Sequence, residues 1–146
     1  DLQTLGYSFS EATSMVNKLD AHATELYLFP QLTLLDVLYP FLLALFLSSL
    51  LFRLIKITDT KSKAASLLLL IPFLAMMFDY AENICVIMMI SKTAALTEAI
   101  VFLSSTFTVL KGVLTSVAWI GILVFTVLWV RLKVLVRNDK QAQAES

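Results

Sequence analysis

Three long apolar stretches dominate the sequence, and short polar or basic segments separate them. They cover about residues 32–52, 64–90 and 98–136. Because roughly 20 apolar residues at about 1.5 Å rise each cross the hydrocarbon core, the first two stretches each predict one spanning helix. The third is too long for a single crossing. We therefore expect either one long helix or a helix pair broken at Gly112, with the span at 112–130.

Residues 8–28 have an amphipathic pattern instead of a uniformly apolar one. Ser8 and Glu11 fit the capping box S-x-x-E, which predicts that a helix begins at Ser8. Apolar side chains then repeat at helical spacing on one side, and they include Met15, Leu19 and Leu26. Since this segment is too polar to span, we expect it to lie on the outer surface of a helical bundle.

Composition agrees with a single membrane domain and excludes several other classes of protein. The chain has 146 residues, is 59% hydrophobic and has a mean hydropathy of +0.85, which soluble domains rarely reach. Its formal net charge of zero does not favour nucleic acid as a partner. One cysteine, Cys85, excludes an intrachain disulfide and a multi-cysteine metal site, and no metal or cofactor motif is evident. We expect an all-α transmembrane helical bundle over residues 1–137, followed by a polar tail at 138–146.

Basic residues indicate the orientation of this bundle. Four lie between Arg53 and Lys63, and four more lie between Arg131 and Lys140. The positive-inside rule then places the loop between the first two spans and the C-terminus in the cytoplasm. Residues 1–31 and the turn at 91–97 are expected outside.

Small residues and a proline predict how the spans pack. Ala44 with Ser48, and Gly112 with Ser116, are small pairs four residues apart, a spacing that permits close approach of membrane helices. Pro72 lies inside the second span, where we expect a kink because proline lacks a backbone N–H.

Ionisable residues within the apolar stretches fall at one level. Asp79, Glu82 and Asn83 share a helix face by their spacing, whereas Asp36 and Lys111 lie in the other two spans. Counted from the cytoplasmic ends, the four charged residues lie roughly 22 to 30 Å up the membrane. Charges at one depth on three helices predict a buried polar cluster in the outer half of the membrane.

We predict that this cluster contains Asp36, Tyr39, Asp79, Glu82, Asn83, Ser104, Thr108 and Lys111, with Tyr80 nearby. A carboxyl oxygen of Asp79 or Glu82 should lie within salt-bridge reach of the Lys111 ammonium, because unpaired charges are disfavoured in hydrocarbon. We expect the cluster to open outward beneath the amphipathic helix. Ionisable residues inside a membrane are functional-site hypotheses, but such a cluster could also lock the packing of the bundle.

Four motifs, taken together, resemble a widespread, uncharacterised family of small bacterial multi-span integral membrane proteins. They are Gly6-Tyr7-Ser8, Leu35-Asp36 with Tyr39-Pro40, Asp79-Tyr80-Ala81-Glu82-Asn83, and Ser105-Thr106-Phe107-Thr108 leading to Lys111. The resemblance implies an all-α membrane fold in the bacterial inner membrane and no known activity. It also implies one more apolar helix before the position of Asp1.

Three hypotheses for function follow. The first is an interaction or binding protein, as an accessory or self-associating subunit or a small-ligand binder, since three spans cannot enclose a permeation path alone. The second is a transporter or proton- or cation-translocating protein that uses Asp79, Glu82 and Lys111 as a relay. The third is an enzyme acting on a lipid at the outer leaflet, with the two carboxyls as acid and base.

The sequence ranks these hypotheses in that order. A relay lacks its inner half, because no ionisable residue lies between Ala64 and Asp79, and inverted repeats are absent from the sequence. An enzyme lacks a nucleophile or metal motif beside the carboxyls. We therefore expect the lipid bilayer as a partner, together with a membrane protein or a second copy of the chain.

Overall fold

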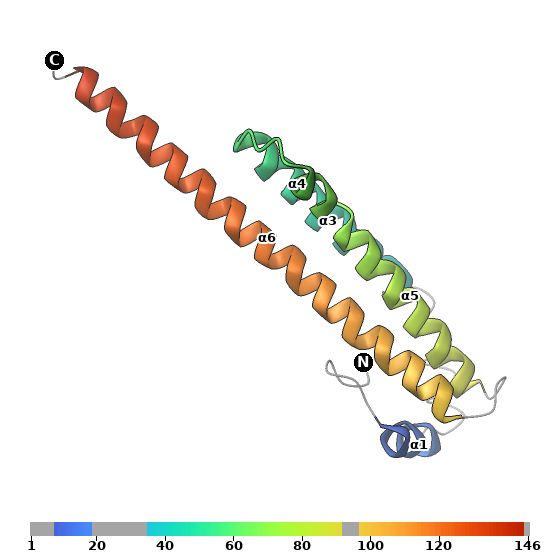
Figure 1. Ribbon diagram of the computed structural model, residues 1–146. Coiled ribbons are helices and arrows are strands. Elements are labelled where there is room, and N and C mark those ends of the chain that lie inside the picture. Colours follow the sequence, from blue (N-terminus) through green and yellow to red (C-terminus); the bar gives the residue numbers. More distant parts are fainter. Residues whose placement is uncertain (1–7, 19–34, 92–96, 145–146) are drawn as a thin grey trace.

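The computed structural model describes residues 8–18, 35–91 and 97–144, and every element in these ranges is an α-helix. In chain order they are α1 (Phe9–Lys18), α3 (Asp36–Ile57), α4 (Lys63–Leu68), α5 (Ile71–Ile90) and α6 (Glu98–Ala144). The helices α3, α5 and α6 run alongside one another, and α1 lies at one end of the bundle (Figure 1). The all-α prediction is confirmed.

Three segments of the described chain are long and apolar enough to cross a membrane. They are α3, the combined α4–α5 segment Lys63–Ile90, and Glu98–Asn138 of α6. The first span was predicted to end at residue 52, but α3 continues to Ile57. Arg53 and Lys56 allow this continuation, because their long side chains can reach polar surroundings while the backbone remains helical. Residues 32–34 of the predicted span lie outside the described residues.

The second span is interrupted where a proline approaches. α4 ends at Leu68 and α5 begins at Ile71, with Pro72 in its first turn. The expected kink is therefore a short break ahead of Pro72, since proline suits the first turn of a helix, where N–H groups have no intrahelical partner. The Ser48 hydroxyl of α3 donates to the Leu69 carbonyl at 2.8 Å, so a neighbouring helix satisfies backbone within the break.

The third apolar stretch forms one unbroken helix. α6 has 47 residues, or roughly 70 Å of length, and extends well past the other helices (Figure 1). Gly112 does not break it, because one glycine costs a helix only about 1 kcal/mol and its neighbours continue the pattern. The polar residues expected as a separate tail after residue 137 continue the helix to Ala144.

On each of the three long helices, many buried residues follow one another at alternating intervals of three and four positions. On α3 these are Pro40, Ala44, Leu47, Leu51 and Leu54. On α6 they include Val101, Ser104, Thr108, Ala118, Ile122 and Phe125. On α5 they include Pro72, Ala75, Glu82, Val86 and Met89. A mean repeat of 3.5 is typical of left-handed, coiled-coil-like packing. Asp79 and Lys111 fall on the same repeat, so charged residues occupy positions that belong to the core.

Two apolar clusters fill the bundle at different levels. The cluster at the α4 end consists of Leu47, Leu51, Leu54, Ala65, Ala118, Ile122 and Phe125. The cluster at the α1 end consists of Ala12, Val86, Met89 and Val101. Along α5 and α6 the charged residues lie between these two clusters.

The N-terminal capping box is confirmed. The Ser8 N–H donates to the Glu11 carboxylate at 2.8 Å, and the Glu11 N–H donates to Ser8 Oγ at 3.4 Å. α1 then packs on the bundle through Ala12, which is buried. Of the predicted helix 8–28, residues 19–28 lie outside the described residues, as do the side chains of Met15, Leu19 and Leu26.

At Gly121, α6 closely approaches side chains of both α3 and α4. A Cβ placed there would lie 2.5 Å from Leu68 Cδ2 and 3.4 Å from Leu51 Cδ2. Of the small pairs that the sequence suggested, Ala44 and Ser48 do lie at a helix contact. The prediction for Gly112 and Ser116 is wrong within this chain, because both are exposed.

We expect Gly121→Ile to lower the free energy of unfolding by about 1–3 kcal/mol, because a branched side chain must displace Leu68 and Leu51. Gly121→Ala should cost less, since the end of the Leu68 side chain can rotate away. Gly112→Ile is the matched control on the same helix and should have little effect. Thermal unfolding in mild detergent measures all three, and equal losses at the two glycines would contradict this packing.

Candidate functional site

Lys111 is bound by two acids inside the bundle. Its Nζ lies 2.5 Å from Asp79 Oδ1 and 2.6 Å from Glu82 Oε2. α5 provides both acids because residues three apart share a helix face, and α6 provides the lysine from its buried face. The ion pair predicted from the common depth of these charges is confirmed. We call Asp79, Glu82 and Lys111 the charged layer.

The charged layer lies in the interior of the spans. Lys111 is ten residues from buried Val101 and 14 residues from buried Phe125, which corresponds to roughly 15 and 21 Å along α6. The Glu82 side chain is only 4% exposed, and those of Asp79 and Lys111 are 19% exposed. Glu82 Oε2 makes no aligned hydrogen bond among the described residues, so the nearby ammonium compensates for its burial.

Among the described residues, carboxylates outnumber ammonium groups at this level. The charged layer has two carboxylates for one ammonium, and Asp36 lies near it because Asn83, next to Glu82, donates to the Asp36 carbonyl at 3.4 Å. Asp36 is half-buried, and within the described part of the chain Lys111 pairs with Asp79 and Glu82 and not with Asp36. Its predicted place near the cluster is correct, but the direct ion pairs belong to Asp79 and Glu82.

The same turn of α5 also contacts α3. The Tyr80 hydroxyl donates to the Val37 carbonyl at 2.6 Å, and Asn83 Nδ2 donates to the Asp36 carbonyl at 3.4 Å. Asp79 and Glu82 therefore face α6, whereas Tyr80 and Asn83 face the first turn of α3. The sequence could place Tyr80 and Asn83 near the cluster, but it contains no signal for which backbone carbonyls they would reach.

Ser104 and Thr108 lie on the buried face of α6, as predicted. Both are almost fully buried, and the Thr108 hydroxyl donates to the Ser104 carbonyl at 3.1 Å. Next to them Phe107 packs on Phe78 of α5, with ring centroids 5.8 Å apart. This hydrogen bond stays within α6, so the Thr108 hydroxyl has a partner without contacting the charged layer.

Tyr39 does not belong to the cluster, and its prediction is wrong. The side chain is 66% exposed, whereas its neighbour Pro40 is buried. Consecutive residues on a helix point about 100° apart, so with Pro40 facing the core Tyr39 turns outward. The position of Tyr39 close to Asp36 in the sequence could not show the direction in which its side chain points.

Among the described residues, an apolar layer lies between α1 and the charged layer. Ala12 of α1 packs with Val86, Met89 and Val101, which lie on the α1 side of Glu82 and Lys111 along their helices. The expected outward opening beneath α1 also depends on residues 19–34 and 92–96, which lie outside the described residues. The site is a paired group enclosed between apolar clusters.

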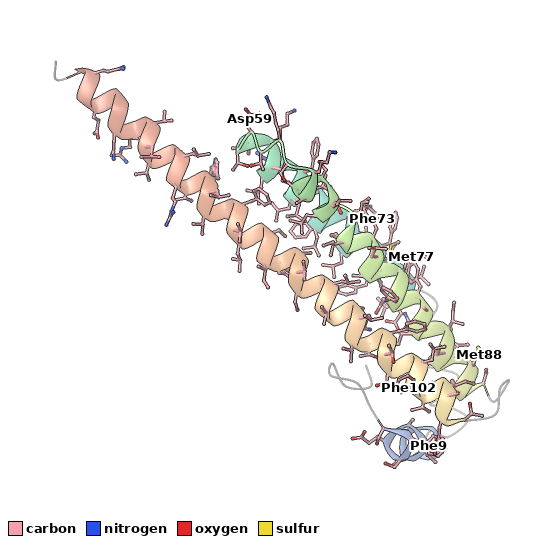
Figure 2. All side chains as sticks on the ribbon, viewed as in Figure 1. Phe9, Asp59, Phe73, Met77, Met88 and Phe102 are labelled. Atoms are coloured by element: carbon pink, nitrogen blue, oxygen red, sulfur yellow. The ribbon has the colours of Figure 1, made fainter. Side chains whose placement is uncertain are left out.

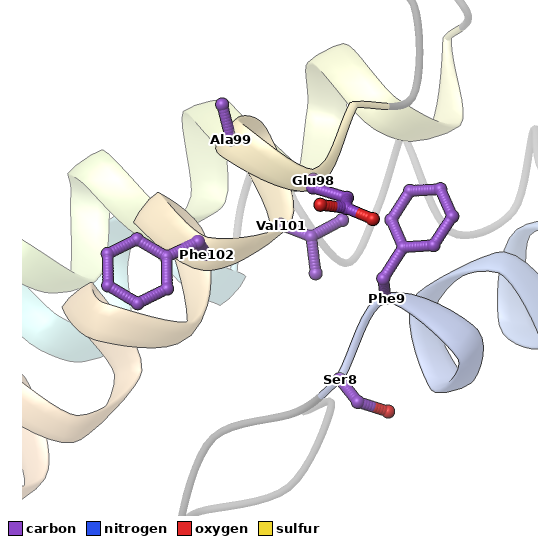
Figure 3. Close-up of a pocket in the computed structure, with 6 residues that line it drawn as sticks. All are labelled: Ser8, Phe9, Glu98, Ala99, Val101 and Phe102. Carbon is purple, nitrogen blue, oxygen red and sulfur yellow. The ribbon is translucent and has the colours of Figure 1, made fainter.

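An open pocket does exist at the outer edge of this apolar layer (Figure 3). It lies between α1 and the start of α6, and its lining is Ser8, Phe9, Glu98, Ala99, Val101 and Phe102. Lys111 is nine residues beyond Phe102, or roughly 14 Å along α6, so the pocket does not reach the charged layer. Glu98 has an ordinary role here, since an acid in the first turn stabilises the helix.

The described residues contain no group of three His, Cys, Asp or Glu side chains that could hold a metal ion. Comparison with known proteins adds no assignment, because no family model, curated protein or solved structure matches the chain. The charged layer must therefore be interpreted from its own geometry.

We expect Lys111→Met to lower the free energy of unfolding by about 3–5 kcal/mol, because it leaves two buried carboxylates without a cation. Adding Asp79→Asn and Glu82→Gln should restore part of the loss. Glu82→Gln alone should cost less than Lys111→Met, since one acid then still pairs with the ammonium. Unfolding in detergent, analysed as a mutant cycle, measures this coupling.

The matched control is Arg131→Met, which removes an exposed base from the same helix and should change stability by less than about 0.5 kcal/mol. If Lys111→Met were equally harmless, the ion pairs would not stabilise the bundle.

Proposed function

We propose that the protein is an integral membrane interaction protein, a small scaffold whose charged layer holds three spans in one arrangement. Its role would be to associate with another membrane protein or with further copies of itself. The motif resemblance described above supports a location in the bacterial inner membrane. The single observation that carries the proposal is that Lys111 is already bound by two acids of the same chain.

That pairing favours a structural use of the charges over ligand binding. A ligand at this site would have to displace a carboxylate from the ammonium, and the space towards α1 is filled by Val86, Met89 and Val101. The electrostatic attraction between the Lys111 ammonium and the two carboxylates is strong where little water is present. The charges therefore serve to join α5 to α6.

The part of the bundle between the charged layer and the α4 end argues against translocation. Between the charged layer and the α4 end the core is an apolar cluster that includes Leu47, Leu51, Ala118 and Ile122, and the hydrogen bond from Ser48 to the Leu69 carbonyl adds no ionisable group. A proton relay uses chains of ionisable groups or water-filled cavities. Among the described residues that fill this part of the core, none is ionisable. Translocation by Asp79, Glu82 and Lys111 is the alternative, and the surplus carboxylate is the observation that favours it.

An enzyme acting on lipid receives less support. A general acid and base must reach the substrate directly or through one water. Glu82 is almost fully buried and both acids contact the lysine, so neither is placed to meet a lipid headgroup.

Extraction of the protein in polymer-bounded native membrane particles tests the interaction role. We expect a stoichiometric protein partner, or a defined oligomer, to remain with the chain and to be identified by mass spectrometry. Recovery of monomer with lipid alone would contradict the proposal.

Reconstitution into liposomes with a trapped pH dye tests the alternative. An imposed proton gradient should decay no faster with the protein than in empty liposomes. A flux that disappears in the variant Asp79→Asn/Glu82→Gln would reject the scaffold role and favour translocation.

The proposed topology has the α3–α4 turn and the C-terminus inside, and the 91–97 segment outside. In a background with Cys85 replaced by alanine, cysteines at Thr60 and Ala95 should react with an impermeant reagent from opposite sides of the membrane. The basic residues from Arg53 to Lys63 provide the physical reason. Labelling of both positions from one side would contradict the assignment.

A further inference from the structure

The end of the bundle opposite α1 has a strongly basic surface formed by two separate parts of the chain. Arg53, Lys56 and Lys63 come from the ends of α3 and α4, and Arg131, Lys133 and Arg137 come from α6. All six are exposed. Lys61 is also exposed and lies 3.9 Å from Asp59, the acid in the α3–α4 turn, but both are more than 80% exposed, so their pairing is weak.

The basic residues of α3 and α4 and those of α6 lie at a similar level along the bundle axis. Leu54 and Phe125 belong to the same apolar cluster, so residues a few positions beyond each of them lie near each other along the bundle axis. Lys56 is two residues past Leu54, and Arg131 is six residues past Phe125. Figure 2 labels Asp59 at the α3–α4 turn, and α6 continues past that point without another helix beside it. Basic side chains of α3, α4 and α6 thus lie toward the same end of the bundle.

The same part of α6 remains strongly apolar. Leu128, Leu132 and Leu135 recur on one side of the helix, and each is at least 41% exposed. Trp129 lies on another side, where the Lys133 ammonium is 5.2 Å from the centre of its ring. Tryptophan beside basic residues is typical of the boundary between hydrocarbon and headgroups. Exposed leucines at this level are more stable in apolar surroundings than in water. The neighbouring basic side chains are more stable beside anionic groups.

We propose that this basic collar, defined by Arg53, Lys56, Lys63, Arg131, Lys133 and Arg137, binds anionic phospholipid. Phosphate groups accept hydrogen bonds from the basic side chains, and the acyl chains cover Leu128, Leu132 and Leu135. A second copy of this chain is a poorer occupant. Copies inserted in the same orientation would bring their own Arg131, Lys133 and Arg137 against identical charges.

Quenching of Trp129 fluorescence by brominated lipids tests the proposal in the full chain, with Trp119 replaced by phenylalanine. Brominated phosphatidylglycerol should quench at a lipid fraction on the order of tenfold or more below that needed for phosphatidylcholine with the same acyl chains. Sodium chloride should reduce this preference, because screening weakens exposed charge interactions. Equal quenching by the two lipids would overturn the proposal.

The variant Arg131→Gln/Lys133→Gln/Arg137→Gln should lose most of the preference. It changes only exposed positions, and circular dichroism checks that it remains helical. Lys18→Gln/Lys92→Gln is the control that removes basic charge from outside the collar, and it should keep the preference. Undiminished preference in the triple variant would also overturn the proposal. Crosslinking between copies through Leu132→Cys, in a background without Cys85 and with every lipid used, would also overturn the proposal. It would show that this face contacts a second chain.

Discussion

The ammonium of Lys111, held between the carboxylates of Asp79 and Glu82, sets the arrangement on which the rest of the bundle depends. Apolar packing that repeats every three and four residues is nearly unchanged when one helix is shifted by one repeat along its neighbour. Apolar contacts alone therefore specify the relative position of the helices along the bundle axis only weakly. Sliding α6 by one turn would move Lys111 by about 5.4 Å and separate it from both acids. In a medium with little water this separation costs far more than a change of apolar neighbours. The charged layer thus selects one register from several with similar packing.

One turn of α5 transmits this register to α3. Asp79 and Glu82 contact α6, while Tyr80 and Asn83 donate to the carbonyls of Val37 and Asp36. Contacts nearer the α4 end agree with the same alignment. Ser48 meets the interrupted backbone at Leu69, and Gly121 leaves room for Leu68. Polar contacts around the charged layer, together with a hydrogen bond and a close apolar approach near the α4 end, therefore support a single arrangement of three helices.

The sequence was sufficient for features that depend on position along a helix. The apolar lengths predicted the spans, the spacing of Ser8 and Glu11 predicted the cap, and the common depth of Asp79, Glu82 and Lys111 predicted their pairing. Rotation about the helix axis was harder to predict. In a lipid-facing bundle both the inner and outer sides of a helix are apolar, so hydropathy does not show which side faces the core. Tyr39 and Gly112 were placed inward for this reason, and the close contact at Gly121 was missed.

The pairing between α5 and α6 also bears on how the chain enters the bilayer during synthesis. Alone, α5 would bring two carboxylates into hydrocarbon, and each charge near a helix centre adds roughly 2.5–3.5 kcal/mol to the free energy of insertion. α6 alone would bring an unpaired lysine. Seven residues separate Ile90 from Glu98, so the partner helix follows almost immediately. Insertion of the two helices as a hairpin neutralises the charges as they leave water, so α5 is favoured to remain near the insertion machinery until α6 has been made.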